Sequence, residues 1–310
     1  MFKKSFIIFI TLFLGVQIFA QENTDTSYWT KGGNISINIS QAYFSNWAAG
    51  GQNAINWLGT ANYDINYAKD NFKWNNNIAL GLGYSYFDFD YKPVKTDDRI
   101  EITSLGALKA TEHLNYSLEF ALRTQFANGY NYSADSTTAI SKFFAPAYIS
   151  LGLGMEWSPN KHFSLNFAPL TGRITIVNDR NLADAGAFGV EAGHYVDDTI
   201  WVPGKMTRME FGARMTANLQ YEIFKNVDFK TKLELFANYL NHPERIDVDW
   251  QVLLVMKVNS WLSCNIATHL IYDYDVPFYD LNEATGLMEL DPNSKVQFKE
   301  VFSIGVSVKL

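Results

Sequence analysis

A strict alternation of apolar and polar residues recurs through residues 53–310 and constrains the fold more than any other feature of this chain. In residues 55–67, for example, the odd positions are apolar or aromatic except for one glycine, whereas the even positions are mostly asparagine, threonine or aspartate. Successive side chains of a β-strand point to opposite faces, and a helix cannot use that period of two. The pattern therefore predicts a chain made almost entirely of strands.

About twelve segments carry this pattern, from residues 34–43 to residues 296–310. The clearest is residues 208–223, and the weakest is residues 99–110, where apolar residues fall on both faces. Short turns are expected near Asp70, Glu112, Asn160, Asn226 and Ser260, and long connections over residues 87–98, 131–141, 178–205 and 275–294. Short and long connections thus alternate, as they do in barrels that have short periplasmic turns and long external loops.

This arrangement predicts an all-β fold, namely a closed antiparallel transmembrane β-barrel of about 12 strands with periplasmic termini and long extracellular loops. Closure is required because an open sheet edge in lipid would leave backbone groups without hydrogen-bond partners. A soluble sandwich also alternates, but here the apolar face is too long and too continuous for the rest of the chain to cover. Aromatic residues near the segment ends, such as Trp74 and Tyr272, are expected to form girdles at the two membrane interfaces.

Composition narrows the class further. Aromatic residues reach 15%, yet the mean hydropathy is only −0.11, a combination that suits a barrel with a wet interior. No segment after residue 20 approaches eighteen unbroken apolar residues, which excludes helical membrane spans. The net charge of −7 argues against a nucleic-acid partner. The single cysteine, Cys264, cannot form an internal disulfide and is expected to pack on an apolar strand face.

Residues 1–20 have the form of a cleaved signal peptide, with two lysines followed by an apolar stretch that ends at Ala20. Residues 21–33 are then expected to be a short periplasmic segment and residues 34–310 the barrel domain, exported to the outer membrane of a Gram-negative bacterium. The apolar face that ends at Leu310 resembles the C-terminal signal recognised by outer-membrane barrel assembly machinery. That machinery and the lipid bilayer are expected partners, and an envelope protein is a further candidate.

The polar face of the strands is expected to line the lumen. Its main charged members are Glu119, Arg123, Arg208, Glu210, Arg214, Lys230, Lys232, Glu234, Asp247, Asp249 and His269. Positive and negative residues are nearly balanced and interleaved, which favours a mutually neutralising network that fills a narrow lumen. The alternative is a polar conduit whose opposed charges orient small solutes. A twelve-stranded interior is intermediate in size, so strand number does not decide between them.

Loops and rims carry a second set of candidate residues. In the segment that starts at Phe163, the apolar positions change phase between Pro169 and Gly172, which predicts a β-bulge that aims the following loop. The loop 178–205 is expected to fold inward as a constriction or plug, or to cover the outer mouth. The residues expected to shape loops and rims are Phe44, Trp47, Gly50, Gly51, Pro169, Gly172, Gly186 and Phe188.

No catalytic, cofactor or metal site is predicted. His269 is expected to face the lumen near Ser263, but no serine stands beside it in the sequence to suggest a catalytic dyad. A calcium site at Asp197 and Asp198 is unspecific, because the loop lacks an ordered series of ligand positions.

Three stretches resemble a known family: QAYFSNWAAGG at 41–51, APLTG at 168–172 and LADAGAFGV at 182–190, together with KTDDR at 95–99. They are similar to the Bacteroidetes outer-membrane family called domain of unknown function 3078, and the resemblance spans the whole mature chain. It implies an outer-membrane barrel in a Gram-negative envelope and supplies no reaction, cofactor or ligand.

Three functions follow as hypotheses. The leading one is a non-enzymatic channel or transport barrel for small solutes, because the expected lumen wall is polar. The second is a closed barrel that serves as a structural or assembly partner in an envelope complex, because the charges balance. The third, ranked low, is an outer-membrane lipid hydrolase.

Overall fold

Twelve strands form a closed antiparallel barrel in the computed structural model, which describes residues 28–43, 53–87, 93–132, 138–197, 199–275, 278–282, 287–291 and 294–310. The fold predicted from the alternation is confirmed. Phe44, Trp47, Gly50 and Gly51, the signal peptide and Asp198 lie outside the described residues.

The barrel strands match the predicted segments closely. They are β1 (Trp29–Ala42), β2 (Ala54–Lys69), β3 (Phe72–Phe87), β4 (Val94–Lys109), β5 (Leu114–Thr124), β8 (Ala147–Asn160), β9 (Phe163–Ile176), β12 (Thr207–Phe224), β13 (Val227–Asn238), β14 (Ile246–Lys257), β15 (Leu262–Tyr272) and β18 (Gln297–Lys309). The long connections hold the remaining elements, namely β6 (Gly129–Tyr130), β7 (Ala139–Ser141), α2 (Arg180–Asp184), η2 (Ala187–Gly189), β10 (His194–Val196), β11 (Ile200–Val202), β16 (Phe278–Asn282) and β17 (Leu287–Asp291). No helix in the described part of the chain is long and apolar enough to span a membrane.

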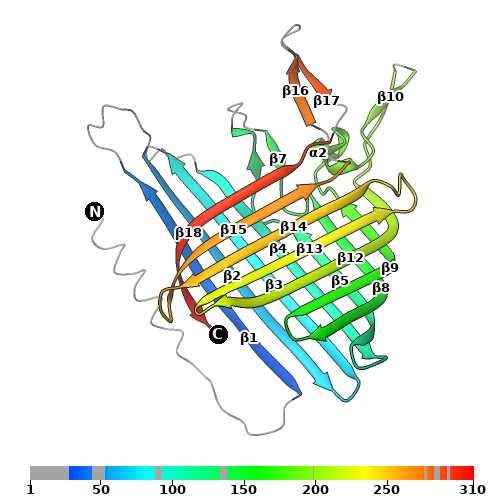
Figure 1. Ribbon diagram of the computed structural model, residues 1–310. Coiled ribbons are helices and arrows are strands. Elements are labelled where there is room, and N and C mark those ends of the chain that lie inside the picture. Colours follow the sequence, from blue (N-terminus) through cyan, green and yellow to red (C-terminus); the bar gives the residue numbers. More distant parts are fainter. Residues whose placement is uncertain are drawn as a thin grey trace.

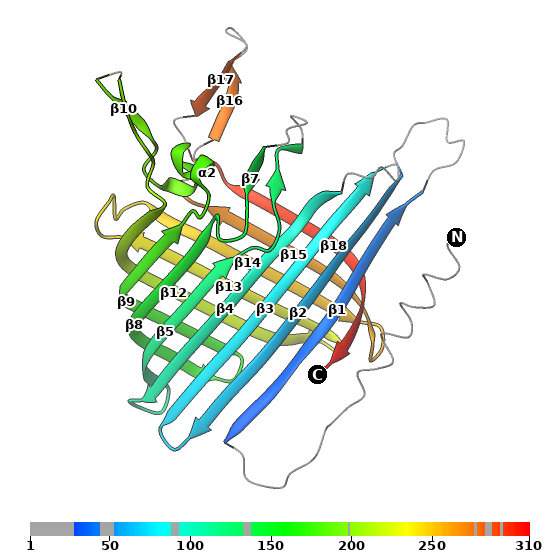
Figure 2. The same ribbon diagram turned by 180° about the vertical axis from the view of Figure 1, so that it is seen from behind.

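Each barrel strand pairs with its neighbours in sequence, and β1 closes the barrel against β18. Figures 1 and 2 show the long strands β1 to β5 on one side and β12 to β15 crossing them on the other. The short turns lie together at one end, called here the turn end, and the elements β7, α2, β10 and β16 lie at the opposite loop end (Figure 1). The alternation of short and long connections is thus an alternation between the two ends.

Two strands start earlier than the sequence pattern predicts. β1 begins at Trp29, not near Asn34, because its first residues extend the ladder with β2 as far as the pair Trp29 and Tyr67. The Trp29 and Tyr67 rings pack against each other in a tilted arrangement, with centroids 5.0 Å apart. β4 begins at Val94, not near Arg99, and a register shift opposite Gly83 interrupts the alternation there. Ladder hydrogen bonds therefore extended both strands where the side-chain pattern was irregular.

The barrel is apolar outside and polar inside. Side chains such as Leu151, Phe167 and Met209 are 54%, 49% and 73% exposed on the outer surface. Side chains that soluble proteins expose are buried instead, and Glu119, Glu210 and Arg214 retain only 7%, 5% and 4% exposure. A wall of this kind is stable only if lipid covers the apolar surface, so the protein is a membrane-spanning barrel of the outer-membrane type. Cys264 lies on the same outward row as Ile266 in β15, as predicted.

β9 contains the predicted bulge. Between Phe167 and Thr171 it has one more residue than either neighbouring strand, since Ala213 of β12 opposes residues 169–170 and Gly154 of β8 opposes residues 168–169. The Thr171 hydroxyl donates to the Ala168 carbonyl at 2.8 Å across the bulge. Proline has no N–H to donate to the ladder, and Pro169 is tolerated here because the bulge interrupts the ladder. Pro169 and Gly172 lie within the wall and not at the rim, because β9 continues to Ile176.

The glycine that this bulge requires is Gly154 of β8. A Cβ atom at Gly154 would lie 2.0 Å from the Phe167 carbonyl oxygen, whereas a Cβ at Gly172 would meet nothing within 4 Å. We expect Gly154→Ala to lower the free energy of unfolding by about 3 kcal/mol, the upper part of the range for overpacking. Gly172→Ala, the matched control, should change it by less than about 0.5 kcal/mol. Urea unfolding in lipid vesicles measures both, and equal effects of the two variants would contradict this role of Gly154.

Candidate functional site

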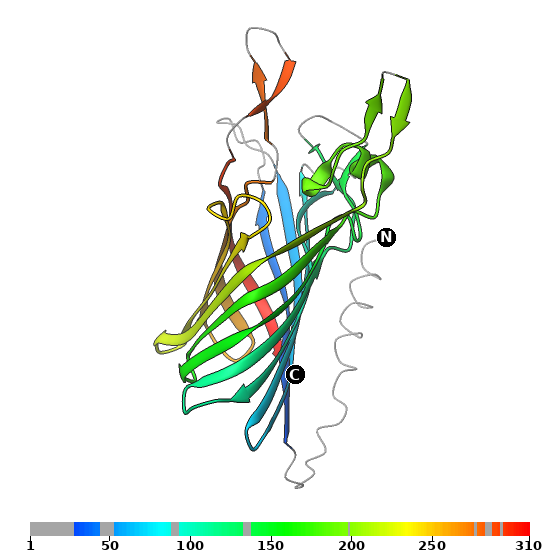
Figure 3. The same cartoon turned by 90° about the vertical axis from the view of Figure 1, so that its right-hand side faces the viewer.

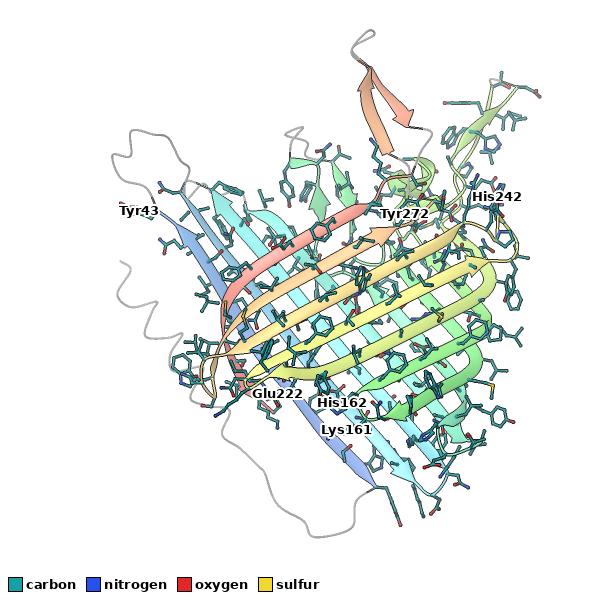
Figure 4. The ribbon with its side chains drawn as sticks, in the orientation of Figure 1. Tyr43, Lys161, His162, Glu222, His242 and Tyr272 are labelled. Carbon is teal, nitrogen blue, oxygen red and sulfur yellow. The ribbon has the colours of Figure 1, made fainter. Side chains whose placement is uncertain are left out.

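The lumen brings together the charged residues predicted from the polar faces. All of them lie on the inward rows, which the ladder fixes through pairs such as Gln251 with His269 and Lys232 with Gln251. Figure 4 shows the two rims that bound this lumen, with His162 and Glu222 at the turn end and His242 and Tyr272 at the loop end. Between the rims the inward side chains form three connected clusters.

The first cluster joins opposite walls. The Arg123 guanidinium of β5 donates to the Asp249 carboxylate of β14, although four strands separate these two in the barrel. His269 Nε2 lies 2.9 Å from the other oxygen of Asp249, and the Gln251 amide donates to that oxygen at 3.1 Å. Glu101 of β4 lies 3.7 Å from Arg123 Nε. The lumen is therefore spanned by a charged bridge that the neighbouring strands support.

The second cluster is built around Glu210 of β12. Arg173 of β9 makes two parallel hydrogen bonds to it, at 2.7 and 2.8 Å, and Arg208 makes a third at 2.8 Å. Arg173 also reaches Asp247 of β14 at 2.8 Å, and its guanidinium carbon lies 3.9 Å from the centre of the Phe236 ring. A planar guanidinium is suited to this bidentate and stacked geometry. The Glu210 carboxylate, only 2% exposed, is thus held by two arginines.

The third cluster surrounds Arg214 of β12, whose side chain is 5% exposed. Its guanidinium donates to Glu234 at 2.8 Å and to the Ser150 hydroxyl at 3.0 Å, and it lies 3.6 Å from Glu119. Glu119 in turn accepts from the Asn166 amide at 2.5 Å. Lys232 lies 3.6 Å from Glu234. This cluster therefore holds a buried arginine between two carboxylates.

Several lumen residues were missed by the sequence pattern. Arg173 stands just after the phase change at the bulge, where the inward positions move from even to odd numbers, and Thr175 beside it was an available signal. Glu101 lies in the segment 99–110, whose alternation was the weakest, and Asp97 lies in the connection that was expected over residues 87–98. Asp97 of β4 forms a 2.6 Å ion pair with Lys299 of β18, which lies beyond β1, β2 and β3.

Three carboxylates lie close together at the loop end of β14 and β15. Oxygen atoms of Asp247, Asp273 and Asp275 lie within 4.8 Å of one another. Two arginines pair with members of this group, Arg173 with Asp247 and Arg208 with Asp275. The geometry belongs to the arginine network and assigns no metal.

The loop 178–205 is folded. Leu182 and Phe188 pack against a buried cluster made by Ala145, Val177, Ala183 and Val190. Gly186 and Phe188 both have positive φ angles, 70° and 58°, which let the chain turn sharply between α2 and η2. The β10–β11 hairpin projects away from the barrel (Figure 3). Arg208 donates from the wall to the Gly189 carbonyl at 3.4 Å, so the base of the loop lies over the mouth rather than deep in the lumen.

Asp179 fixes the start of this loop. Its carboxylate accepts from Lys142 and caps α2 by accepting from the Leu182 N–H at 3.1 Å. The Lys142 ammonium, and then the backbone donors, hold the pKa of Asp179 below its ordinary value near 4. A carboxyl group with a lowered pKa stabilises the fold above its unfolded-state pKa, and that stabilisation is lost as pH falls through the folded-state pKa.

We therefore expect acid to loosen α2. Hydrogen exchange at the Leu182 amide should accelerate between about pH 4 and pH 2, beyond the intrinsic pH dependence of exchange. Asp179→Asn keeps the cap acceptor and removes the titration, so its corrected exchange rate should not change over this range. Identical acid responses of the two proteins would rule out Asp179 as the titrating group.

His269 is hydrogen-bonded to Asp249, and the hydroxyl of Ser263 donates to Asn265 at 3.2 Å. The described contacts of His269 therefore place it in the first charge cluster and not beside a serine. The lipid-hydrolase hypothesis gains no supporting geometry from them.

Comparison with known proteins identifies two families. Residues 39–130 match a protein family of unknown function, DUF3078, and residues 139–288 match a second one, DUF481. The predicted resemblance to DUF3078 is thus confirmed for the first part of the barrel. It does not extend over the whole chain as expected, because the stretches at 168–172 and 182–190 lie in the DUF481 match. No curated protein matches the sequence.

Solved structures that resemble the chain include three bacterial barrels. The NanC porin is 10% identical with a TM-score of 0.35, and the match covers 91% of this chain and 100% of that one. The translocator domain of the autotransporter NalP from Neisseria meningitidis is 6% identical with a TM-score of 0.39, covering 92% and 89%. An outer membrane channel from Pseudomonas putida F1 is 10% identical with a TM-score of 0.37, covering 93% and 99%.

The inward charges, the outward apolar surface and the closed ladder together identify the chain as a β-barrel of the outer-membrane type, in which residues 39–130 match DUF3078 and residues 139–288 match DUF481.

Proposed function

We propose that the protein is a channel or transport barrel for small polar solutes, restricted by the charge clusters in its lumen. The observation that carries the proposal is the Arg123–Asp249 bridge. It spans the lumen between opposite walls, yet the Arg123 side chain remains 37% exposed. Water therefore reaches this contact, and opposed charges at a constriction orient and select small solutes.

Reconstitution into planar bilayers tests this proposal. Discrete conductance steps are expected from the purified full chain, with a current that depends on the charge of the permeating ion. Absence of conductance, both in the full chain and in a variant lacking residues 178–205, would remove the channel function.

A closed barrel that acts as a structural or assembly partner is the second candidate. It is favoured by the third cluster, because Arg214 and Glu119 are only 5% and 9% exposed and neutralise one another. Mild detergent extraction followed by co-purification distinguishes this function, since a stable stoichiometric envelope partner together with a silent bilayer would support it.

The proposal assigns no reaction to the barrel. Phospholipid turnover by the purified protein that disappears in His269→Ala would contradict it.

Signal-peptide export and recognition of the β18 outward row by the barrel assembly machinery belong to the same proposal. Deletion of Leu310 should then reduce the fraction of the protein that reaches the outer membrane, as measured by membrane fractionation.

A further inference from the structure

The barrel wall has one short seam. Pairing between β1 and β18 covers six residue pairs and ends where Ile39 meets Ile304. Beyond that point, Ser40–Ala42 pair with β2 and residues 297–303 of β18 pair with β15 on their other side. No pairing between β1 and β18 joins them there among the described residues. Figure 1 shows the two strands separating toward the loop end.

A cavity of about 280 Å³ lies at this separation. Its lining includes Ile39 and Phe302, which are 54% and 61% exposed on the outward rows. It also includes Asn38 and Ser303, which are on the inward rows and only 6% and 9% exposed. Because residues from both faces of the wall line one cavity, the separation connects the lipid-facing surface with the lumen.

The in-and-out pattern is inverted beside this cavity. Apart from Ala54 and Ala68 near the ends of the strand, the inward row of β2 is polar except for Leu58, and the inward row of β18 is polar or glycine except for Val301. The outward row of β18 is apolar except for Glu300. Gln297, the first residue of β18, lies on the inward row. All three exceptions, Leu58, Glu300 and Val301, line the cavity. The apolar surface thus turns from the outside of the barrel into the lumen at this place.

We propose that this separation is a lateral portal that binds a single-chain amphiphile with an uncharged, hydrogen-bonding head group, such as a monoacylglycerol. The alkyl chain lies against Trp57, Leu58, Val301 and Phe302, which continue the lipid-facing surface inward. The head group meets the side chains of Asn56 and Ser40, which are hydrogen-bonded to each other at 2.9 Å in the cavity lining. Among the described residues, residues 298–303 of β18 have no ladder partner on the β1 side, and an ester or hydroxyl supplies hydrogen bonds to such an edge that a bare hydrocarbon does not.

Size and charge restrict the ligand further. The cavity is slightly smaller than the roughly 300–1,000 Å³ typical of sites for drug-sized ligands, so it accommodates one chain and not a two-chain phospholipid. Lys299 is paired with Asp97, which leaves the outward Glu300 carboxylate to repel an anionic head group. This inference goes beyond solute conduction through the lumen, because the ligand enters from the membrane.

Photolabelling tests the portal. The full chain in phosphatidylcholine nanodiscs is labelled with 1-lauroylglycerol that carries a diazirine in its acyl chain, and labelled peptides are mapped by mass spectrometry. Label is expected at Ile39, Leu58, Val301 and Phe302. The double variant Leu58→Thr/Val301→Thr makes both inward rows polar and should lower this labelling about tenfold, the effect of losing about 1.4 kcal/mol of apolar contact.

The control is Leu105→Thr, which makes the same change on the inward row of β4, outside the cavity, and should leave the labelling within about twofold of the wild type. Ser40→Trp fills the cavity while keeping Leu58 and Val301, and the same loss is expected from it. Heat-modifiable migration in gels checks that each variant is folded. If the double variant does not fold, the labelling of Ser40→Trp tests the portal instead.

Label spread evenly over the outward rows, and unchanged in both cavity variants, would overturn the portal. Equal labelling by a diazirine fatty acid with a charged carboxylate would overturn the uncharged head group. Conductance of the same variants is recorded in parallel, so that failure of the portal is separated from failure of the channel.

Discussion

Replacing Arg214 with methionine is expected to lower the free energy of unfolding by about 3–5 kcal/mol, the range for removing one partner from a buried ion pair. The Arg214 side chain is 5% exposed, forms ion pairs with Glu234 and Glu119, and donates a hydrogen bond to the Ser150 hydroxyl. Methionine fills similar space without charge, so the two carboxylates would be left in the lumen with Lys232 as the nearest described cation of this cluster. Urea unfolding in vesicles, followed by tryptophan fluorescence, measures the loss.

Lys230→Met provides the matched control. Lys230 lies on the inward row of β13 but is exposed, and the variant should change the free energy of unfolding by less than about 0.5 kcal/mol. The double variant Arg214→Met/Glu234→Gln should recover part of the loss, because it removes one of the carboxylates left without its partner. A loss below 1 kcal/mol for Arg214→Met would show that water, and not the protein, stabilises this cluster.

Removing the bridge between opposite walls is expected to have the largest effect on conduction. Arg123→Ala deletes the side chain that crosses to Asp249 and leaves Asp249 and Glu101 facing the opening. We expect the single-channel conductance to rise about twofold or more and the selectivity to shift toward cations. Planar-bilayer recordings under a salt gradient give both quantities, the second from the reversal potential.

The opposite charge change provides the internal comparison. Asp249→Asn keeps the size of the side chain and leaves Arg123 with Glu101 as its described carboxylate partner, so the reversal potential should shift toward anions. Shifts of the same sign in both variants, or an unchanged conductance in Arg123→Ala, would place the constriction elsewhere in the chain.

The alternation was sufficient to predict nearly every barrel strand, because each strand has one face in lipid and one in the lumen. It failed where that requirement is relaxed. At Trp29 and Val94 the ladder extends beyond the regular pattern, toward the ends of the barrel. Arg173 was missed for a related reason, since the bulge moves the inward positions by one residue.

The sequence predicted which charged residues face the lumen, but it did not predict which of them pair with one another. Arg123 and Asp249 are 126 positions apart, and each could have faced many carboxylates or cations on the inward rows. The loop 178–205 was expected to plug or cover the barrel, but the pattern of its residues did not predict α2 and η2. They form there because Val177 and Ala183 pack in an apolar cluster with Ala145, which precedes β8.

By itself, the sequence determined the number of strands, their faces and the alternation of turns and loops, because a period of two with one side in lipid depends only on neighbouring residues. Only the tertiary structure decided which charges meet and where the wall separates. Both depend on the register with which β1 closes against β18, and that register sets distances between residues far apart in the chain. The exceptions at Leu58, Glu300 and Val301 were visible as single irregular residues, but their common meaning required the closed barrel that brings them to one cavity.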